Sequence, residues 1–311
     1  MNHARRRFLR LVPPALTTLG FGWSACGIRS ADASDSPQRF RIASVPQQDM
    51  EERYAAAYRA LEAYLAPRLG VPVSVHPLEN ATLALEGLRA GKLDLCNFSP
   101  WPFLLAESRA NVEALLFTRT PEGGTGSYRS LLVTHRGTGL ANAEDVLERA
   151  AEITFSFEEA VSTSGHLAPR AFFHQIGIDP EKDFKRVLFS TDGTTNLLAV
   201  KARRLDLAAV SDSTLRRAVD RGRISPDDIV VVWRSEPLLS GITAIRRALP
   251  AAFRRRVQTL FIDLPTAEPA LWAEVARQYS HPVAGYSAAD ESLLLPYRRL
   301  VGTVPGLALS A

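Results

Sequence analysis

The chain has 311 residues, of which 46% are hydrophobic and 23% are charged. At about 150 residues per domain, this length predicts two domains with their own cores, and the apolar fraction excludes a largely disordered chain. Four of the 37 Lys and Arg residues lie within residues 1–25, which contain no acidic residue, so the remainder carries equal numbers of basic and acidic groups. This balance argues against binding to nucleic acid or to an anionic membrane surface.

Residues 1–25 have the pattern of an export signal. The Arg-rich segment Met1–Arg10 precedes a mostly apolar stretch, Leu11–Ala25. That stretch is shorter than the ~20 residues of a membrane-spanning helix, which indicates a cleaved signal. The run Arg5–Arg10 also resembles a twin-arginine signal. An ordinary secretory signal fits the same residues, so both routes stay open.

The processing site has two alternatives. The segment Ser24–Gly27 resembles a bacterial lipobox, in which Cys26 would be lipidated, although Trp23 stands where Leu is usual. Ala31–Ala33 offers an ordinary cleavage site instead. We favour the lipidated form. The polar residues 26–38 are predicted to form a tether.

Residues 40–97 alternate short apolar runs with helical periodicity. The predicted strands are Phe40–Val45, Val71–His76 and Leu93–Asn97, and the predicted helices are Glu51–Leu69 and Thr82–Ala90.

A strand at Tyr128–Thr134 leads into a second alternating series. Its predicted strands are Ile153–Phe155, Arg186–Phe189, Leu205–Val210 and Ile229–Val232, and its predicted helices are Ser164–Gln175, Asn196–Arg203 and Asp212–Arg221. The tail from about Pro250 is predicted to be largely helical, with Asp290–Val301 as its clearest amphipathic segment. Alternating strands and helices predict parallel sheets in α/β layers.

One segment of the first series recurs in the second. Leu85–Leu95 reads LEGLRAGKLDL and Leu197–Leu207 reads LLAVKARRLDL, so that Asp94 and Asp206 are equivalent. Each copy predicts a helix, a tight basic turn and a strand, with the aspartate as a turn partner rather than as part of a catalytic pair. Two such lobes would place their strand ends and helix starts across a common cleft, where open α/β sheets bind ligands.

The sharpest local motif is Ser162-Thr163-Ser164-Gly165, immediately before a predicted helix. Free backbone N–H groups, the positive end of the helix dipole and three hydroxyl groups converge there, which suits a tetrahedral oxyanion. A helix cap made by a single Ser or Thr explains the same motif, and the motif by itself does not separate the two interpretations.

The motif, with Pro169 following it, resembles the substrate-binding proteins of ABC importers for phosphonate, phosphite and related phosphate analogues. Gly177–Lys185, Gly91–Pro100, Tyr128–Val133 and Trp233–Arg246 are similar to further segments of that family, so the resemblance spans about residues 40–260.

The resemblance implies an α/β, class II-like periplasmic-binding-protein fold with two lobes. Each lobe would be a mixed sheet flanked by helices, and strands crossing between the lobes would join them. Lobe I would comprise residues 39–136 and 234–311, and lobe II residues 137–233. A ligand held between the lobes would stabilise the closed state, which an importer then recognises.

The resemblance also implies which residues bind the ligand. They are the motif hydroxyls, an aromatic position, two residues of the second-lobe turn and one residue of the crossing strand: Ser162, Thr163, Ser164, Phe98, Thr194, Asn196 and Tyr128. Packing on the crossing strand is at least as good an interpretation of Tyr128.

Three positions depart from family members suited to aminoalkylphosphonates. Ala81 replaces a Tyr, Gly193 lies where those members have an oxyanion-binding His, and Gly241 lies where they have an acidic residue for the amine. An ammonium group left unpaired in a closed cleft would be costly, which favours a smaller or differently substituted anion.

A serine hydrolase is the alternative from another class. Ser162 and His166 lie four residues apart, and Asp192 or Asp206 would complete a triad. The chain lacks the Gly-x-Ser-x-Gly elbow and Ser162 has no Ser-x-x-Lys pattern. The six His residues lack metal-ligand spacing, so neither a metal nor a cofactor is expected.

We therefore expect an exported, non-enzymatic monomer that is periplasmic or attached to the cell envelope. Its partners would be a small anion and an ABC permease, with contact to the membrane only through a lipid on Cys26. A membrane sensor in place of the permease is equally compatible with the sequence.

Overall fold

The computed structural model describes residues 36–45, 51–279, 281–307 and 309. The predicted signal segment, Cys26 and all of the predicted tether except residues 36–38 lie outside this part. None of the helices within the described residues combines the length and apolar character of a membrane span.

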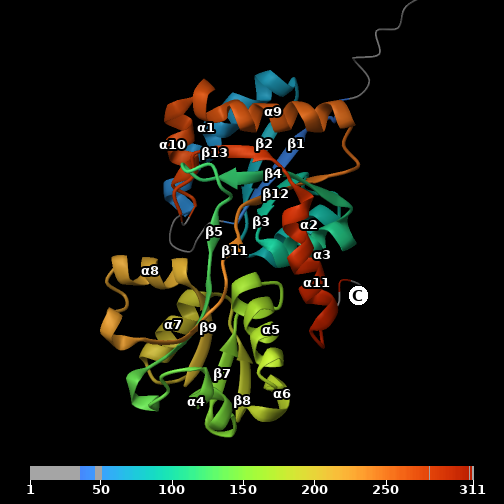
Figure 1. Ribbon diagram of the computed structural model, residues 1–311. Coiled ribbons are helices and arrows are strands. Elements are labelled where there is room, and N and C mark those ends of the chain that lie inside the picture. The colour runs from blue at the N-terminus through green and yellow to red at the C-terminus, as the bar shows by residue number, and fades with distance from the viewer. Residues whose placement is uncertain (1–35, 46–50, 280, 308, 310–311) are drawn as a thin grey trace, which may run out of the picture. The chain divides into compact units, whose positions relative to one another are not determined.

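The first sheet has six strands in the order β13-β4-β12-β3-β1-β2 (Figure 1). Their bounds are β1 Phe40–Ser44, β2 Val73–Pro77, β3 Leu95–Phe98, β4 Val112–Arg119, β12 Ile242–Arg246 and β13 Gly285–Ala288. β1 pairs in parallel with β2 and β3, whereas β12 pairs antiparallel with β3 and β4, and β13 pairs antiparallel with β4. Strands from both ends of the chain therefore build one mixed sheet.

Helices cover both faces of this sheet. On one face lie α1 (Glu51–Leu69), α9 (Ala251–Ala267) and α10 (Pro269–Ala276), and their apolar residues share a core with the strands. On the other face lie α2 (Ala81–Arg89), α3 (Pro100–Ala110) and α11 (Leu295–Thr303), which pack in a second core. Apolar side chains are therefore buried on both faces of the sheet. This arrangement is expected for strands with near-continuous hydrophobic runs.

The second sheet has five strands in the order β10-β6-β9-β7-β8. Their bounds are β6 Ser130–Thr134, β7 Thr154–Phe157, β8 Arg186–Phe189, β9 Leu207–Ser211 and β10 Val230–Arg234. Adjacent residues of a strand enter opposite cores: Leu132 packs with α4 (Ala143–Glu148) and α5 (Ala168–Gln175), whereas Leu131 and Val133 pack with α7 (Gly193–Lys201) and α8 (Asp212–Asp220). A short helix, α6 (Pro180–Asp183), precedes β8.

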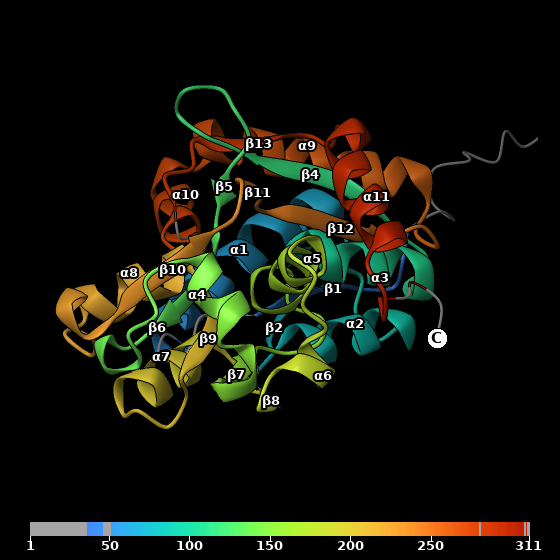
Figure 2. The same cartoon turned by 60° about the horizontal axis from the view of Figure 1, so that its bottom comes forward.

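Two chain segments cross between the sheets. β5 (Ser127–Tyr128) and β11 (Leu238–Leu239) pair antiparallel, and they run side by side between the sheets in Figure 2. The predicted α/β class with two mixed sheets and crossing strands is confirmed. The alternation along the sequence alone had predicted parallel sheets, which is wrong for β4, β6, β10, β12 and β13.

The lobe boundaries differ from the predicted positions 136/137 and 233/234. Ser130–Thr134, which we assigned to lobe I, pairs with β9 and β10 in the second sheet. We therefore propose that the chain crosses at β5 and β11. The predicted strand 128–134 is interrupted at Arg129, and the tail contains the strand β13 in addition to helices.

The recurring sequence segment has the same structure in both sheets. Asp94 Oδ2 accepts a hydrogen bond from the Arg41 amide at 2.9 Å, and the Asp94 amide donates to the Arg41 carbonyl at 2.8 Å. In the second sheet, Asp206 makes the same reciprocal pair with Thr154, at 2.8 and 3.1 Å. Each aspartate thus joins the start of its strand to a parallel neighbouring strand, rather than acting within the turn as we predicted.

Candidate ligand-binding site

The two lobes touch where the loop before α5 meets the start of α3. Thr163 Oγ1 accepts a hydrogen bond from the Trp101 amide and shares another with Ser99 Oγ, both at 2.8 Å. The Trp101 indole donates to the Ala160 carbonyl at 2.9 Å. Near the start of α2, Thr82 Oγ1 donates to a carboxylate oxygen of Glu159 at 3.0 Å. The Ser-Thr-Ser-Gly segment therefore lies at the lobe interface.

Two cavities adjoin this interface. The first, which we call the charged cavity, has a volume of about 260 Å³, is lined from both lobes, and contains the charged side chains Glu79, Glu158, Glu159, Asp192, Arg217, Arg221 and Arg223. The second, the uncharged cavity, measures about 290 Å³, and none of the described residues lining it is charged. Ser99 and Val45 line both cavities.

Ser162 lines the charged cavity and caps the helix that follows it. Its hydroxyl accepts a hydrogen bond from the Gly165 amide and donates to Glu158 Oε2, both at 2.9 Å. The next turn, Thr163–Leu167, is π-helical before α5 begins. The predicted helix cap is therefore confirmed at Ser162, and its role in binding an oxyanion stays a prediction.

Thr163 and Ser164 are almost fully buried between the lobes. The Ser164 carbonyl accepts a hydrogen bond from Ser130 Oγ at 2.6 Å, which fixes the segment to the second sheet. Burial raises the pKa of Tyr128 above its ordinary range, and hydrogen bonding to Ser99, Ser164 and Thr163 opposes this rise. Four hydroxyl side chains therefore gather at the point where the two lobes and the crossing strand meet.

The remaining predicted ligand-binding residues lie in three different places. Phe98 and Tyr128 line the uncharged cavity, and Thr194 lines the charged cavity at the start of α7. Asn196 lies elsewhere: it is 1% exposed, and its amide group donates to the carbonyls of Ala209 and Phe157. This corrects the expectation that Asn196 faces the cleft, because a residue one turn into α7 points toward the sheet.

Glu158 lies between the starts of two helices. A Cβ atom added to Gly193 would lie 2.4 Å from Glu158 Oε1, and one added to Gly165 would lie 2.3 Å from the Glu158 Cβ. Both glycines are therefore needed to admit this side chain. Burial is the main cause that raises the pKa of Glu158, to about 7. The neighbouring charges of Asp192 and Glu159 add to the rise, whereas Ser162 and Arg217 oppose it.

Arg217 enters the same cavity from α8. Its Nη2 donates to Thr214 Oγ1 at 3.1 Å, while its Nη1 is buried without a hydrogen-bond partner. Burial, followed by the charge of Arg221, lowers the pKa of Arg217 to about 10. A desolvated guanidinium nitrogen without an acceptor is costly, so the cavity offers a donor to an anion.

Comparison with known families decides what kind of protein carries this site. Residues 42–294 match the family described as "ABC transporter, phosphonate, periplasmic substrate-binding protein". The chain belongs to this family.

Two curated relatives of the family and one solved structure are similar to the chain. It is 24% identical to the phosphonates-binding periplasmic protein of Escherichia coli over 71% of its own length and 64% of that protein's. It is 24% identical to the phosphate-import protein PhnD of Mycolicibacterium smegmatis, over 75% of the chain and 74% of the relative. A crystal structure of a binding protein component of an ABC phosphonate transporter from Pseudomonas aeruginosa has a TM-score of 0.72 at 23% identity, covering 86% of both chains. The two-lobe periplasmic-binding-protein fold is thereby confirmed.

The three departures from aminoalkylphosphonate-binding members all lie at the cavities. Ala81 and Gly193 line the charged cavity and Gly241 lines the uncharged one. At Gly241, φ is +72° and a Cβ atom would lie 2.3 Å from Thr118 Cγ2, so this backbone leaves no room for an acidic side chain. Glu158 nevertheless supplies a carboxyl group to the charged cavity, from a part of the chain that our comparison of motifs passed over.

The residues of the hydrolase alternative are held by other partners within the described part of the chain. The Ser162 hydroxyl donates to Glu158, whereas His166 Nε2 accepts from Arg170. Asp192 caps α7 and Asp206 joins two strands. Burial, and then Arg170, lowers the pKa of His166 to about 4, so this imidazole is a poor base near neutral pH.

The sequence analysis missed Glu158 and Arg217. Glu158 had a local signal, because it follows the buried strand β7 directly and precedes the hydroxyl motif by four residues. Arg217 had none: one turn of α8 carries Arg216 and Arg217, and only the packing of that helix turns the second of them into the cavity.

Proposed function

We propose that the chain is the extracytoplasmic substrate-binding protein of an ABC importer and captures a small oxyanion of the phosphonate, phosphite or phosphate type. The observation that carries this proposal is the charged cavity, which takes Ser99 from one lobe and Ser162 and Thr194 from the starts of two helices in the other. Helix starts and hydroxyl groups suit tetrahedral oxyanions. The ligand-binding roles of the predicted residues remain part of this proposal.

Closure of the lobes supplies the mechanism. The crossing segments β5 and β11 are the two short connections about which the lobes can turn. An oxyanion that contacts Ser99 and Ser162 together binds the closed arrangement better than an open one, and only this difference in affinity shifts the equilibrium. The permease would then receive the ligand from the closed form.

Residues outside the described part of the chain would determine whether the protein is attached to the cell envelope. We propose export by the signal in residues 1–25 and attachment through a lipid on Cys26, with the protein acting as a monomer. Ala31–Ala33 would give an unattached protein instead. Mass spectrometry of the mature N-terminus separates the two: a diacylated Cys26 supports the anchor, and an unmodified N-terminus beyond residue 31 overturns it.

A membrane sensor remains the second candidate for a partner. The same closed lobes would be presented to either protein, so ligand binding does not distinguish them. Reconstitution with the permease and its ATPase does: ligand-dependent stimulation of ATP hydrolysis supports the importer, and its absence together with stimulation of a sensor kinase supports the alternative.

The ligand class is tested by thermal shift and calorimetry with phosphate, phosphite, methylphosphonate, sulfate and acetate on the full chain. A ligand that binds only the folded form raises the melting temperature. The double variant Ser162→Ala, Thr163→Ala should weaken oxyanion binding at least tenfold. Two hydrogen bonds to a charged group contribute about 1.5–3 kcal/mol each, and tenfold requires only about 1.4 kcal/mol. No binding by the wild-type chain would overturn the proposed function, and unchanged affinity in the variant would overturn this site.

A further inference from the structure

Glu158 and Arg217 line the same cavity. Among the described residues, Glu158 Oε2 accepts a hydrogen bond from Ser162, and Arg217 donates from Nη2 to Thr214 on its own helix. Within the described part of the chain neither charged group forms a salt bridge, and Arg217 Nη1 is buried without an acceptor. The cavity therefore presents a hydrogen-bond acceptor and a cationic donor to whatever fills it.

A carboxylate in an oxyanion site discriminates among anions. A fully ionised oxyanion offers only acceptor oxygens, so it would meet an ionised Glu158 with like charge and no hydrogen bond. A monoprotonated phosphonate carries one P–O–H donor and two further oxygens that share its negative charge. It alone can donate to a carboxylate and accept from a guanidinium at the same time. A sulfonate at neutral pH has no such proton.

We propose that Glu158 and Arg217 together select monoprotonated phosphorus oxyanions, namely phosphonates, phosphite or phosphate, and reject sulfonates and sulfate. This inference rests on the proposed function and names the chemical form of its ligand. The P–O–H group donates to Glu158, and the anionic oxygens accept from Arg217. Gly165 and Gly193 hold the carboxyl in place by leaving it room between two helix starts.

The groups around Glu158 tune the sharing of that proton. Ser162 and Glu159 face it from its own loop, Asp192 from the start of α7 and Arg217 from α8. Two acidic neighbours and burial act against the ionised carboxylate, whereas one hydroxyl and one guanidinium favour it. Because the pKa of Glu158 is about 7, its carboxyl group and the P–O–H group of a phosphonate are acids of comparable strength, and they can share one proton.

The decisive experiment compares methylphosphonate with methanesulfonate, which differ little in shape. Calorimetry at pH 7.5 on the wild-type chain should show a preference for the phosphonate. In Glu158→Gln the amide keeps the shape, loses the charge and gains a donor. Since a carboxyl with a pKa of about 7 is still about one quarter protonated at pH 7.5, methanesulfonate should bind about fourfold tighter in this variant and the preference should narrow by the same factor. Glu148→Gln, on the exposed side of α4, is the matched control and should leave both affinities unchanged.

Arg217 is tested with the same two ligands. Arg217→Gln should weaken both by at least tenfold and keep their ratio, because the guanidinium contacts anionic oxygens that both ligands possess. Arg256→Gln, exposed on α9, controls for the loss of one positive charge and should change neither affinity. Circular dichroism checks that every variant is folded.

A measurement on the wild-type chain keeps the test independent of the variants. Methanesulfonate needs a protonated Glu158, so its affinity should fall about tenfold per pH unit above pH 7 and level off at lower pH. A wild-type chain that binds no oxyanion would overturn the proposed function itself. A chain that binds methylphosphonate but accepts methanesulfonate equally, has pH-independent sulfonate affinity, or keeps its preference in Glu158→Gln would overturn this inference alone.

Discussion

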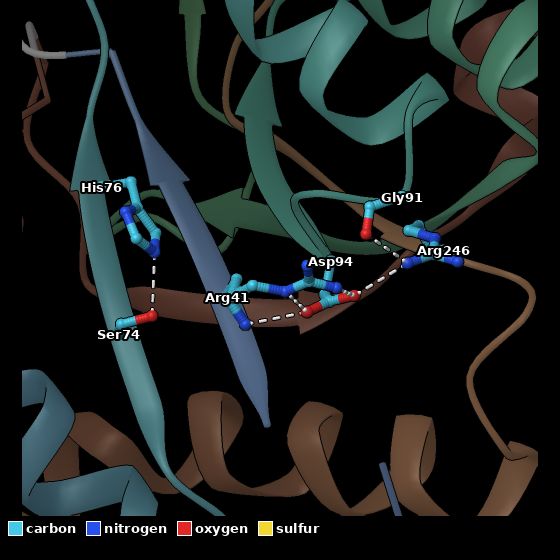
Figure 3. Close-up of polar contacts among 6 residues, drawn as sticks. All are labelled: Arg41, Ser74, His76, Gly91, Asp94 and Arg246. Atoms are coloured by element: carbon cyan, nitrogen blue, oxygen red, sulfur yellow. Dashed lines mark hydrogen bonds and ion pairs between the residues drawn. The ribbon is translucent and has the colours of Figure 1, made fainter. Parts of the chain in front are cut away.

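Asp94 in the first lobe is fully buried and Glu158 in the second is partly buried, and the surroundings of these two carboxyl groups are opposite. Asp94 is 1% exposed and binds Arg41 Nε at 2.9 Å and Arg246 Nη1 at 3.0 Å (Figure 3). It also accepts from the Arg41 amide. Among the residues that the structure describes, Glu158 accepts from one hydroxyl and forms no ion pair with the guanidinium of Arg217.

The difference shows how one chemical group serves two purposes. Asp94 is surrounded by donors from β1 and β12, so its charge is compensated within the protein and its role is to join strands (Figure 3). Glu158 lacks such compensation and lines a cavity, so its remaining hydrogen-bonding capacity is directed at a ligand. Burial alone does not identify a functional carboxylate. What distinguishes it is whether hydrogen bonds and ion pairs within the protein already compensate its charge.

The largest effect is expected from Asp94→Asn. Removing one member of a buried charged cluster leaves the other charges uncompensated, which typically costs about 3–5 kcal/mol of unfolding free energy. Asp206→Asn is the matched control, because Asp206 makes the equivalent backbone pair but has no salt bridge among the described residues, and should cost about 1 kcal/mol. Urea unfolding monitored by circular dichroism measures both. Equal losses would contradict the view that the two arginines distinguish Asp94 from its counterpart.

Part of this comparison could be predicted from the sequence. The recurrence of Leu-Asp-Leu after a basic turn was sufficient to predict a helix, a turn and a strand within eleven residues. It was not sufficient to predict that Asp94 and Asp206 bond to a neighbouring strand, because those partners lie more than 50 positions away. The arginine at 246 was not predictable, since it reaches Asp94 only after β12 has returned from the second lobe to pair with β3.

The candidate site was less predictable for the same physical reason. The Ser162 motif was recognisable as a helix start because capping is local. Asn196 was placed in the cleft together with Thr194, but the two residues lie two positions apart on α7, which is roughly 200° around the helix, so they occupy opposite faces. Glu158 and Arg217 lie 59 positions apart, so their common cavity is a product of packing that no short window of sequence contains.

Glu158→Gln should produce an intermediate effect that depends on pH, unlike Asp94→Asn. The folded-state pKa of Glu158 lies above the ordinary 4.5, so the folded protein retains a proton that the unfolded chain loses between pH 4.5 and 7. The unfolding free energy of the wild type therefore falls across that window, and the neutral amide removes the fall. After allowance for partial exposure, the variant should be about 1–2 kcal/mol more stable than wild type above pH 7 and equal to it below pH 4.5. Urea unfolding in a series of buffers measures this, and a difference that does not vary with pH would contradict it.

Ser162→Ala should have the smallest effect on stability. It removes the hydroxyl that donates to Glu158, so this carboxyl becomes even less compensated by donors than Asp94 is. The lost hydroxyl donates to the Glu158 carboxylate and caps the helix, so the pKa of Glu158 should rise above about 7 while the unfolding free energy falls by about 1 kcal/mol. Ser162→Gly separates these two consequences, because glycine at a helix cap costs only a few tenths of a kcal/mol. Titration of Glu158 by carboxyl ¹³C NMR should give the same raised pKa in both variants, with the stability loss confined to the alanine variant. If the pKa of Glu158 is unchanged in both variants, Ser162 does not stabilise the ionised carboxylate. Arg217 would then be the group that counteracts the rise in pKa caused by burial.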